Sequence, residues 1–124
     1  SKFAKNAGGI VNELELKLEK KEFENARLYL KLRKYEAAIV TLEDFIKEFP
    51  GSSFQEEAFF LTIKTAHDYA QASIRSVQNK RFKSCVDKYQ TFVDKYPNSN
   101  FLKEAEKYYV NSTDFLSKFA LRNN

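Results

Sequence analysis

The residue types that carry catalytic or metal chemistry are scarce in this chain, and their spacing predicts no enzyme site. His67 is the sole histidine, and no good metal ligand stands three or four residues from it on the same helical face. Cys85 is the sole cysteine, so the chain forms no internal disulfide, and we expect a packed, unreactive thiol. Neither a glycine-rich phosphate loop nor a Ser-His-Asp spacing occurs. We therefore expect a protein that is not an enzyme, with no catalytic residue, no metal site and no cofactor.

Two basic pairs are the candidates for a binding site: Arg33-Lys34 and Lys80-Arg81, 47 residues apart. We expect both pairs in turns between helices, at matching places on one edge of a stacked fold. There Arg33, Lys34, Lys80 and Arg81 would meet an acidic surface of a partner protein. The alternative is that these cations only satisfy the carbonyl ends of the preceding helices.

These pairs open two similar segments of the chain. The segment RKYEAAIVTLEDFIKEFPGSSFQEEA, residues 33–58, recurs as KRFKSCVDKYQTFVDKYPNSNFLKEA, residues 80–105. In both segments, apolar residues follow the steps of three and four that form one stripe on an α-helix. A fixed internal period of this kind predicts a repeat protein.

Each copy holds a small residue and a proline at the same place. Ala38 and Cys85 are the small residues, and we expect both to be buried where two helices cross closely. Pro50 and Pro97 cannot extend a helix and so predict its end. The serines that follow supply turn and N-cap chemistry, with Ser53 and Glu56 as an expected capping box.

The periodicity predicts an all-α protein of about five antiparallel helices that stack as an α-solenoid. We expect the third helix to be contacted from both sides, and the fifth to carry Tyr108 and Phe115 near its outer face as an end-cap. The expected domain covers residues 12–119, after a flexible lead-in or cloning remnant (1–11) and before a frayed tail (120–124). The expected helices are Asn12–Leu32, Tyr35–Phe49, Ser53–Gln78, a fourth from the turn Asn79-Lys80-Arg81 to Tyr96, and Phe101–Phe119.

Composition limits the class of protein. The chain has 124 residues, 43% of them hydrophobic, which predicts a single folded domain. The net charge of +4 is modest, and lysines and glutamates alternate along helical faces, so we expect no nucleic-acid partner. No apolar run approaches the length of a membrane span, and no signal peptide is recognisable.

The residues of the first copy resemble a tetratricopeptide repeat, through Ala26, Tyr29 and Leu32 followed by Tyr35, Ala38, Leu42, Phe45 and Pro50. The ordinary repeat has about 34 residues, whereas the period here is 47. The resemblance thus implies a right-handed α-solenoid of long tetratricopeptide-like repeats. Long helix pairs that end in Phe/Tyr-Pro-x-Ser resemble the BamD (YfiO) family of outer-membrane assembly lipoproteins. The resemblance covers residues 14–119 and is closest to the C-terminal half of a Bacteroidetes-type member.

This resemblance implies a protein–protein interaction scaffold that helps to assemble and insert β-barrel proteins into the outer membrane. It also implies partners, namely the barrel-forming assembly subunit and accessory lipoproteins. The implied location is the periplasm at the inner face of the outer membrane, with the full-length protein lipid-anchored. Two alternatives stay open: another periplasmic repeat adaptor of the Tol-Pal-associated type, and a nucleic-acid-binding helical repeat.

Overall fold

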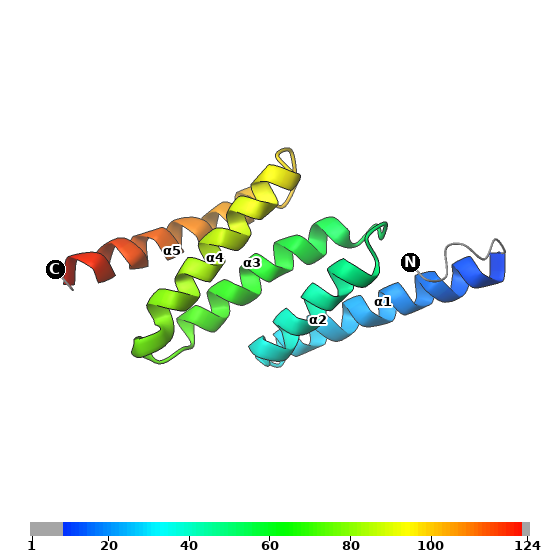
Figure 1. The fold of residues 1–124 in the computed structure, drawn as a ribbon, viewed down its shortest axis with the longest axis horizontal. Coiled ribbons are helices and arrows are strands. Elements are labelled where there is room, and N and C mark those ends of the chain that lie inside the picture. Colours follow the sequence, from blue (N-terminus) through cyan, green and yellow to red (C-terminus); the bar gives the residue numbers. More distant parts are fainter. Residues whose placement is uncertain (1–8, 123–124) are drawn as a thin grey trace. The chain divides into compact units, whose positions relative to one another are not determined.

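The computed structural model describes residues 9–122, and helices joined by short turns make up this part of the chain (Figure 1). The chain divides into two compact units, of which the first ends at Ala58 and the second begins at Phe59. The prediction of an all-α protein is confirmed, since the described residues contain no strand. The helices are α1 (Gly9–Lys31), α2 (Tyr35–Glu48), α3 (Gln55–Gln71), α4 (Arg75–Lys95) and α5 (Leu102–Arg122).

The first unit is an antiparallel hairpin of α1 and α2, closed by the first turn of α3 (Figure 1). Its core is aromatic: the Phe23 ring lies 5.6 Å from the Phe45 ring and stacks on the Phe54 ring at 4.8 Å. The side-chain amide of Gln55 donates to the Phe49 carbonyl at 2.8 Å. The first turn of α3 therefore satisfies the carbonyl end of α2 while Phe54 covers the hairpin core.

The second unit packs the rest of α3 against α4 and α5. On α3, the Phe60 ring lies 6.4 Å from Phe92 of α4 and 4.8 Å from Phe101, which precedes α5. Between α4 and α5, the Tyr89 and Tyr109 rings stack at 4.3 Å. Burial of these rings is the main driving force for pairing the three helices.

The turns around Pro50 and Pro97 have the same structure. After Pro50, the Phe54 N–H donates to Ser52 Oγ at 3.1 Å, and after Pro97 the Phe101 N–H donates to Ser99 Oγ at 3.0 Å. Four backbone hydrogen bonds also recur 47 residues later, each within 0.3 Å of the same length. These bonds are Phe49 N to Phe45 O, Ser52 N to Phe49 O, Gln55 N to Ser52 O and Ala58 N to Phe54 O, with their counterparts from Tyr96 N to Phe92 O through Ala105 N to Phe101 O.

The second helices of the two hairpins repeat after 47 residues, whereas the first helices, α1 and α3, repeat after a shorter distance. Phe23 and Phe60 hold matching places, because each stacks nearly parallel on the phenylalanine of the serine turn, Phe54 or Phe101. Those first-helix rings are 37 residues apart, whereas the turn residues are 47 apart. The second hairpin is therefore ten residues longer than the first.

The additional residues lie beside the turn that joins the two helices of the second hairpin. Helix α1 continues eight residues beyond Phe23, whereas α3 continues eleven residues beyond Phe60. Helix α2 begins at Tyr35, whose counterpart in the second copy is Phe82. Helix α4 begins seven residues before Phe82. The proline-serine ends of the two copies thus keep the same geometry, and the opposite end of the second hairpin is extended.

The expected helix over Ser53–Gln78 is wrong, because α3 ends at Gln71 and a turn at 72–74 precedes α4. Ile74 has an extended backbone (φ −66°, ψ 153°), which stops the helix without a proline or glycine. The Gln78 side-chain amide donates to the Ala70 carbonyl at 3.0 Å and satisfies one of the last carbonyls of α3. The expected turn at Asn79-Lys80-Arg81 therefore lies inside α4.

Several local expectations also need correction. Asn12, the expected first residue of the first helix, lies inside α1, and Ser52, rather than Ser53, accepts the N–H at the start of the next helix segment. Within α1, Glu19 is buried and Leu14 is exposed, the reverse of what their side-chain types favour. Residues 9–11 and 120–122 are helical, and the remainder of the expected lead-in and tail lies outside the described residues.

Candidate functional site

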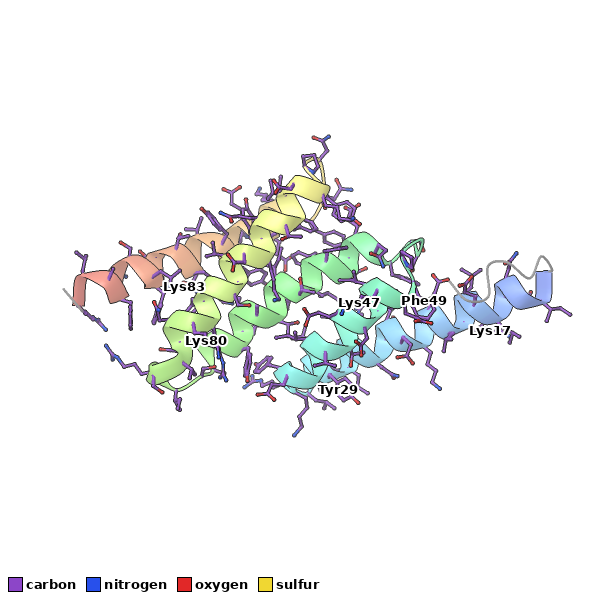
Figure 2. The ribbon with its side chains drawn as sticks, in the orientation of Figure 1. Lys17, Tyr29, Lys47, Phe49, Lys80 and Lys83 are labelled. Carbon is purple, nitrogen blue, oxygen red and sulfur yellow. The ribbon has the colours of Figure 1, made fainter. Side chains whose placement is uncertain are left out.

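The four cations expected at matching turns lie in two different settings. Arg33 and Lys34 lie in the exposed turn between α1 and α2, as expected. Lys80 (Figure 2) and Arg81 lie within α4, about one and a half helical turns from its start. The turn that corresponds to Arg33-Lys34 is 72–74, which holds alanine, serine and isoleucine. The expectation of two equivalent basic turns is therefore wrong, and a partner-binding role of these residues stays a prediction.

Arg33 closes the end of α1 with a left-handed backbone (φ 59°). Its N–H donates to the Leu30 carbonyl at 3.0 Å, and the Lys34 N–H donates to the Tyr29 carbonyl at 2.8 Å. This pair of bonds is the Schellman pattern, which usually has glycine in the left-handed position. The turn backbone is thereby fixed, while the Arg33 and Lys34 side chains extend into water.

Arg81 is held by contacts inside the second unit. Its guanidinium carbon lies 4.0 Å from the centre of the Tyr69 ring, and Nη1 donates to Ser73 Oγ at 2.7 Å. The Ser73 hydroxyl in turn donates to the Tyr69 carbonyl. Arg81 therefore joins α4 to the end of α3, whereas Lys80 next to it is exposed.

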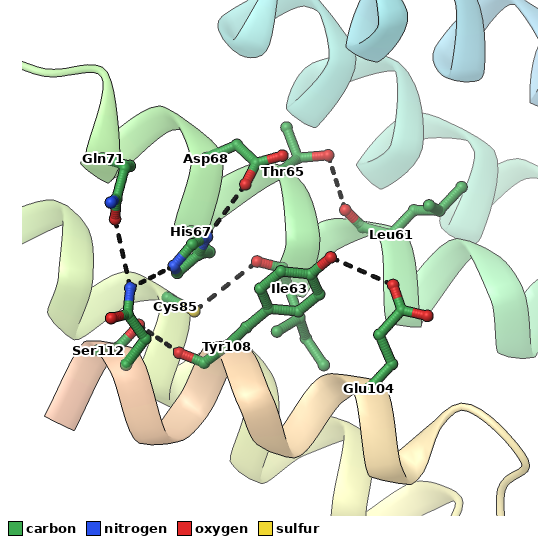
Figure 3. Close-up of polar contacts among 11 residues, drawn as sticks. Leu61, Ile63, Thr65, His67, Asp68, Gln71, Cys85, Glu104, Tyr108 and Ser112 are labelled. Atoms are coloured by element: carbon green, nitrogen blue, oxygen red, sulfur yellow. Dashed lines mark hydrogen bonds and ion pairs between the residues drawn. The ribbon is translucent and has the colours of Figure 1, made fainter. Parts of the chain in front are cut away.

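A polar cluster surrounds His67 where α3 faces α5 (Figure 3). The His67 Nδ1 lies 3.0 Å from Asp68 Oδ1, and its Nε2 lies 2.6 Å from Asn111 Nδ2. The Asn111 amide also donates to Gln71 Oε1 at 3.2 Å. With Asn111 as donor, Nε2 accepts and Nδ1 carries the proton toward Asp68. The imidazole thus links α3 to α5 through Nε2, while Nδ1 contacts Asp68 on its own helix.

Cys85 occupies the buried position expected for the small residue of the second copy. Both Ala38 and Cys85 are 0% exposed, which confirms their predicted burial. The Cys85 Sγ lies 3.7 Å from the Ile63 carbonyl on α3 (Figure 3). Burial raises the pKa of the Cys85 thiol, so the reactive thiolate form is disfavoured.

Tyr108 faces the interior of the second unit, and the prediction of an outward-facing end-cap is wrong. Its ring lies 4.9 Å from the His67 ring, and its hydroxyl donates to Glu104 Oε2 at 3.1 Å (Figure 3). Burial, followed by this hydrogen bond to a carboxylate, raises the pKa of Tyr108. Phe115 also points inward, 4.4 Å from the Phe82 ring. Both rings face inward because α5 packs against α3 as well as α4.

A shallow hollow of about 500 Å³ lies beside α2 in the first unit. Its floor includes Phe45 and Phe49, and its rim carries Glu22, Asp44 and Glu48 together with Lys47 (Figure 2 labels Lys47 and Phe49). Within residues 9–122, no three histidine, cysteine or carboxylate side chains are grouped as a metal site would require. The rim carboxylates are therefore a solvated acidic border around an aromatic floor.

Two hairpins with the same proline-serine turn and the same aromatic stacking define a class: an all-α protein built from repeated helical hairpins. A family model described as YfiO, outer membrane lipoprotein, matches residues 15–121. Because this match covers most of the sequence, the chain belongs to the YfiO outer membrane lipoprotein family. No curated protein matches the chain. None of the helices in residues 9–122 has both the length and the apolar character of a membrane span.

Proposed function

We propose that this chain is a protein-binding scaffold of the outer-membrane β-barrel assembly machinery, without catalytic activity of its own. The family match over residues 15–121 carries this proposal. In the proposed setting, the chain is the C-terminal half of a BamD-like, Bacteroidetes-type lipoprotein at the periplasmic face of the outer membrane. Its partners are the barrel-forming subunit and accessory lipoproteins, and the lipid anchor belongs to the full-length protein.

We further propose that the hairpins stack as a right-handed solenoid of tetratricopeptide type. The first hairpin supports this proposal, because Ala26, Ala38 and Pro50 follow one another at intervals of twelve residues. Ala26 and Ala38 are both buried, which allows their helices to approach closely. Small-angle X-ray scattering from the chain tests the arrangement. A solenoid predicts an elongated distance distribution, and a compact spherical one would contradict it.

The assembly role is tested by co-purification from membranes. The full-length protein, carrying an affinity tag, is expected to retain the barrel-forming subunit after mild detergent extraction. A variant that lacks residues 15–121 is expected to lose the subunit while remaining in the membrane fraction. Retention of the subunit by the truncated protein would place the contact outside this chain and contradict the proposal.

The basic residues are tested separately in each unit. Substitution of both Arg33 and Lys34 by glutamate is expected to reduce the amount of barrel-forming subunit that is retained. The salt dependence of this binding should also decrease, since both side chains are exposed. The matched control reverses Lys20 and Lys21, which are exposed on α1 of the same unit. In the second unit, Lys80→Glu is the informative variant. Arg81→Glu also breaks the Tyr69 and Ser73 contacts and so tests folding together with binding.

A further inference from the structure

The second unit contains a hollow of about 640 Å³ between the start of α4 and the end of α5. This volume is in the range of small-ligand sites. The hollow is lined by Arg75 and Ser76 of α4 and by Phe115, Lys118, Phe119 and Arg122 of α5. None of these residues belongs to the basic pairs discussed above.

The hollow results from the lengthening of the second hairpin. Gln78 is level with the end of α3, because its side chain bonds the Ala70 carbonyl. The first turn of α4, which holds Arg75 and Ser76, therefore extends past the end of α3. Phe115 fixes the opposite wall, since its ring packs against Phe82 at 4.4 Å. The first hairpin has no such extension, because α2 begins directly at Tyr35.

The lining combines hydrogen-bond donors with an aromatic floor. Its polar side chains are two guanidinium groups, one ammonium group and one hydroxyl group, and none of the described lining residues carries a carboxylate. The Lys118 ammonium lies 3.1 Å from Asp114 just outside the hollow, so its charge is partly neutralised. Arg75 and Arg122 therefore supply most of the attraction for an anion. The start of α4 adds to it, since no side chain caps that helix end.

Two exposed aliphatic side chains stand next to the two arginines in the sequence. Ile74, which precedes Arg75, is 73% exposed, and Leu121, which precedes Arg122, is 76% exposed. A solvated leucine or isoleucine alone requires no explanation. Here each aliphatic residue adjoins a cation of the same hollow, which is the combination that membrane-surface segments use.

We propose that this hollow binds the phosphate of an anionic phospholipid headgroup, with Ile74 and Leu121 entering the interfacial region of the bilayer. A phosphodiester has acceptor atoms only, which matches a lining that supplies donors. A peptide would also bring N–H groups that need acceptors, and the lining side chains other than the Ser76 hydroxyl supply none. The observations therefore favour a lipid over an acidic protein segment.

The test is co-sedimentation of the chain with phosphatidylcholine vesicles that contain either no phosphatidylglycerol or about 30% of it. Binding is expected only to the vesicles with phosphatidylglycerol, and it should weaken with added salt. The double variant Arg75→Gln/Arg122→Gln is expected to bind at least about tenfold more weakly, because two cations near an anionic surface are lost. The double variant Ile74→Ser/Leu121→Ser should lose affinity severalfold while keeping its salt dependence.

The matched control is Lys103→Gln/Lys107→Gln, which removes the same charge from exposed positions on α5 outside the hollow. Its affinity is expected to stay within about twofold of the unsubstituted chain. Far-ultraviolet circular dichroism and the urea midpoint of each variant show that all of them are folded. An equal loss in the control and in the arginine variant would overturn the proposal, because attraction would then follow net charge alone.

Two further measurements separate the possible sources of the anion. Glycerol phosphate at millimolar concentration is expected to compete only weakly, since it lacks the acyl chains that Ile74 and Leu121 would contact. If glycerol phosphate binds as tightly as the vesicles do, the site is one for a free phosphate and the proposal fails. If polyglutamate binds through Arg75 and Arg122 while the vesicles do not bind, the occupant is an acidic polypeptide and the proposal fails as well.

Discussion

Arg33 shows how a single residue stores strain in the first hairpin. A left-handed backbone costs a residue with a Cβ atom about 1–2 kcal/mol more than it costs glycine. The turn keeps this conformation because the Schellman hydrogen bonds of Arg33 and Lys34 close the end of α1. A non-glycine residue in such a position invites a functional explanation, and here the exposed arginine is a candidate partner contact.

Arg33→Gly is expected to stabilise the fold by up to about 1 kcal/mol, because relief of strain exceeds the extra entropy of glycine in the unfolded chain. Arg33→Ala removes the same charge but keeps the Cβ atom, so it should give no gain. The urea midpoints of the two variants separate the backbone effect from the charge effect. An alanine variant as stable as the glycine variant would show that the turn is unstrained.

Tyr108 gives the fold a weakness at high pH. Its pKa lies above the ordinary value of 10.0 in the folded state, chiefly because the hydroxyl is desolvated. The folded state therefore keeps the proton where the unfolded chain releases it. The contribution of protonated Tyr108 to the free energy of unfolding is therefore fully present below about pH 10. It decreases as the pH rises toward the pKa of the folded state.

Tyr108→Phe is accordingly expected to reduce the stability at pH 8 by about 1 kcal/mol, through loss of the hydrogen bond to Glu104. Above pH 10 the difference should shrink or reverse, since phenylalanine does not ionise. Urea unfolding at pH 8 and pH 11 measures both effects. Cys85 and Tyr89, whose pKa values are also raised, are present in both proteins, so their contributions cancel. A difference that is the same at both pH values would contradict this role of Tyr108.

At the scale of elements, the proline-serine turn is the most regular feature of the chain. Ser52 and Ser99 accept equivalent N–H groups over nearly equal distances, 3.1 and 3.0 Å. In each copy the next helix then starts with the same backbone hydrogen bonds. The turn is therefore a local structure that each copy forms from its own residues.

Ser52→Ala and Ser99→Ala are each expected to cost about 1 kcal/mol, the usual effect of losing a side-chain cap at a helix start. The two costs should agree within about 0.5 kcal/mol because the geometry is the same. Ser53→Ala is the control and should change the urea midpoint little, since Ser53 is exposed. A cost at Ser53 as large as that at Ser52 would restore the capping box that the sequence suggested.

The sequence predicted the helix ends that proline defines. It missed the end of α3, where side-chain contacts hold the turn. Pro50 and Pro97 end α2 and α4 almost where expected, because no helix can pass them. The break at 72–74 holds no proline or glycine, and the apolar spacing of Ala70, Ile74 and Val77 continues a helical stripe across it. Gln78 and Arg81, which lie beyond the break, hold that turn in place.

The prediction of two equivalent basic turns failed for a related reason. The period of 47 residues predicts that Lys80-Arg81 lies opposite Arg33-Lys34, but this period does not hold at that end of the hairpins. The number of residues between matching positions changes within the hairpin, since the first helices repeat after 37 residues. Burial of Ala38 and Cys85 was predictable, because that position lies beyond the inserted residues, where the longer period holds.

At the scale of the whole molecule, the two units have separate cores. Phe45 packs with Phe23 and Phe49 in the first unit, and Phe92 packs with Phe60 and Tyr96 in the second. Phe45 and Phe92 hold matching places 47 residues apart, and both are buried. In repeat proteins, stability is a sum of terms from each repeat and from its neighbours.

Phe45→Leu and Phe92→Leu are each expected to destabilise the chain by about 1–3 kcal/mol. Hydrogen exchange measured by mass spectrometry should show the larger increase in the unit that carries the substitution. Phe45→Leu should thus mainly affect residues 9–58, and Phe92→Leu residues 59–122. Equal increases in both units for either variant would show that the two cores unfold as one.

The extended end of the second hairpin shows where this architecture tolerates change. Ten residues were accommodated beside the turn at 72–74 while the proline-serine ends of the two copies stayed superimposable in their hydrogen bonds. Ala72, an exposed residue of that turn, is consequently the natural place to attach a fluorophore or a cross-linker, because it leaves the contact between Ser73 and Arg81 intact. Such a probe would report on the chain's surroundings without altering the proline-serine ends.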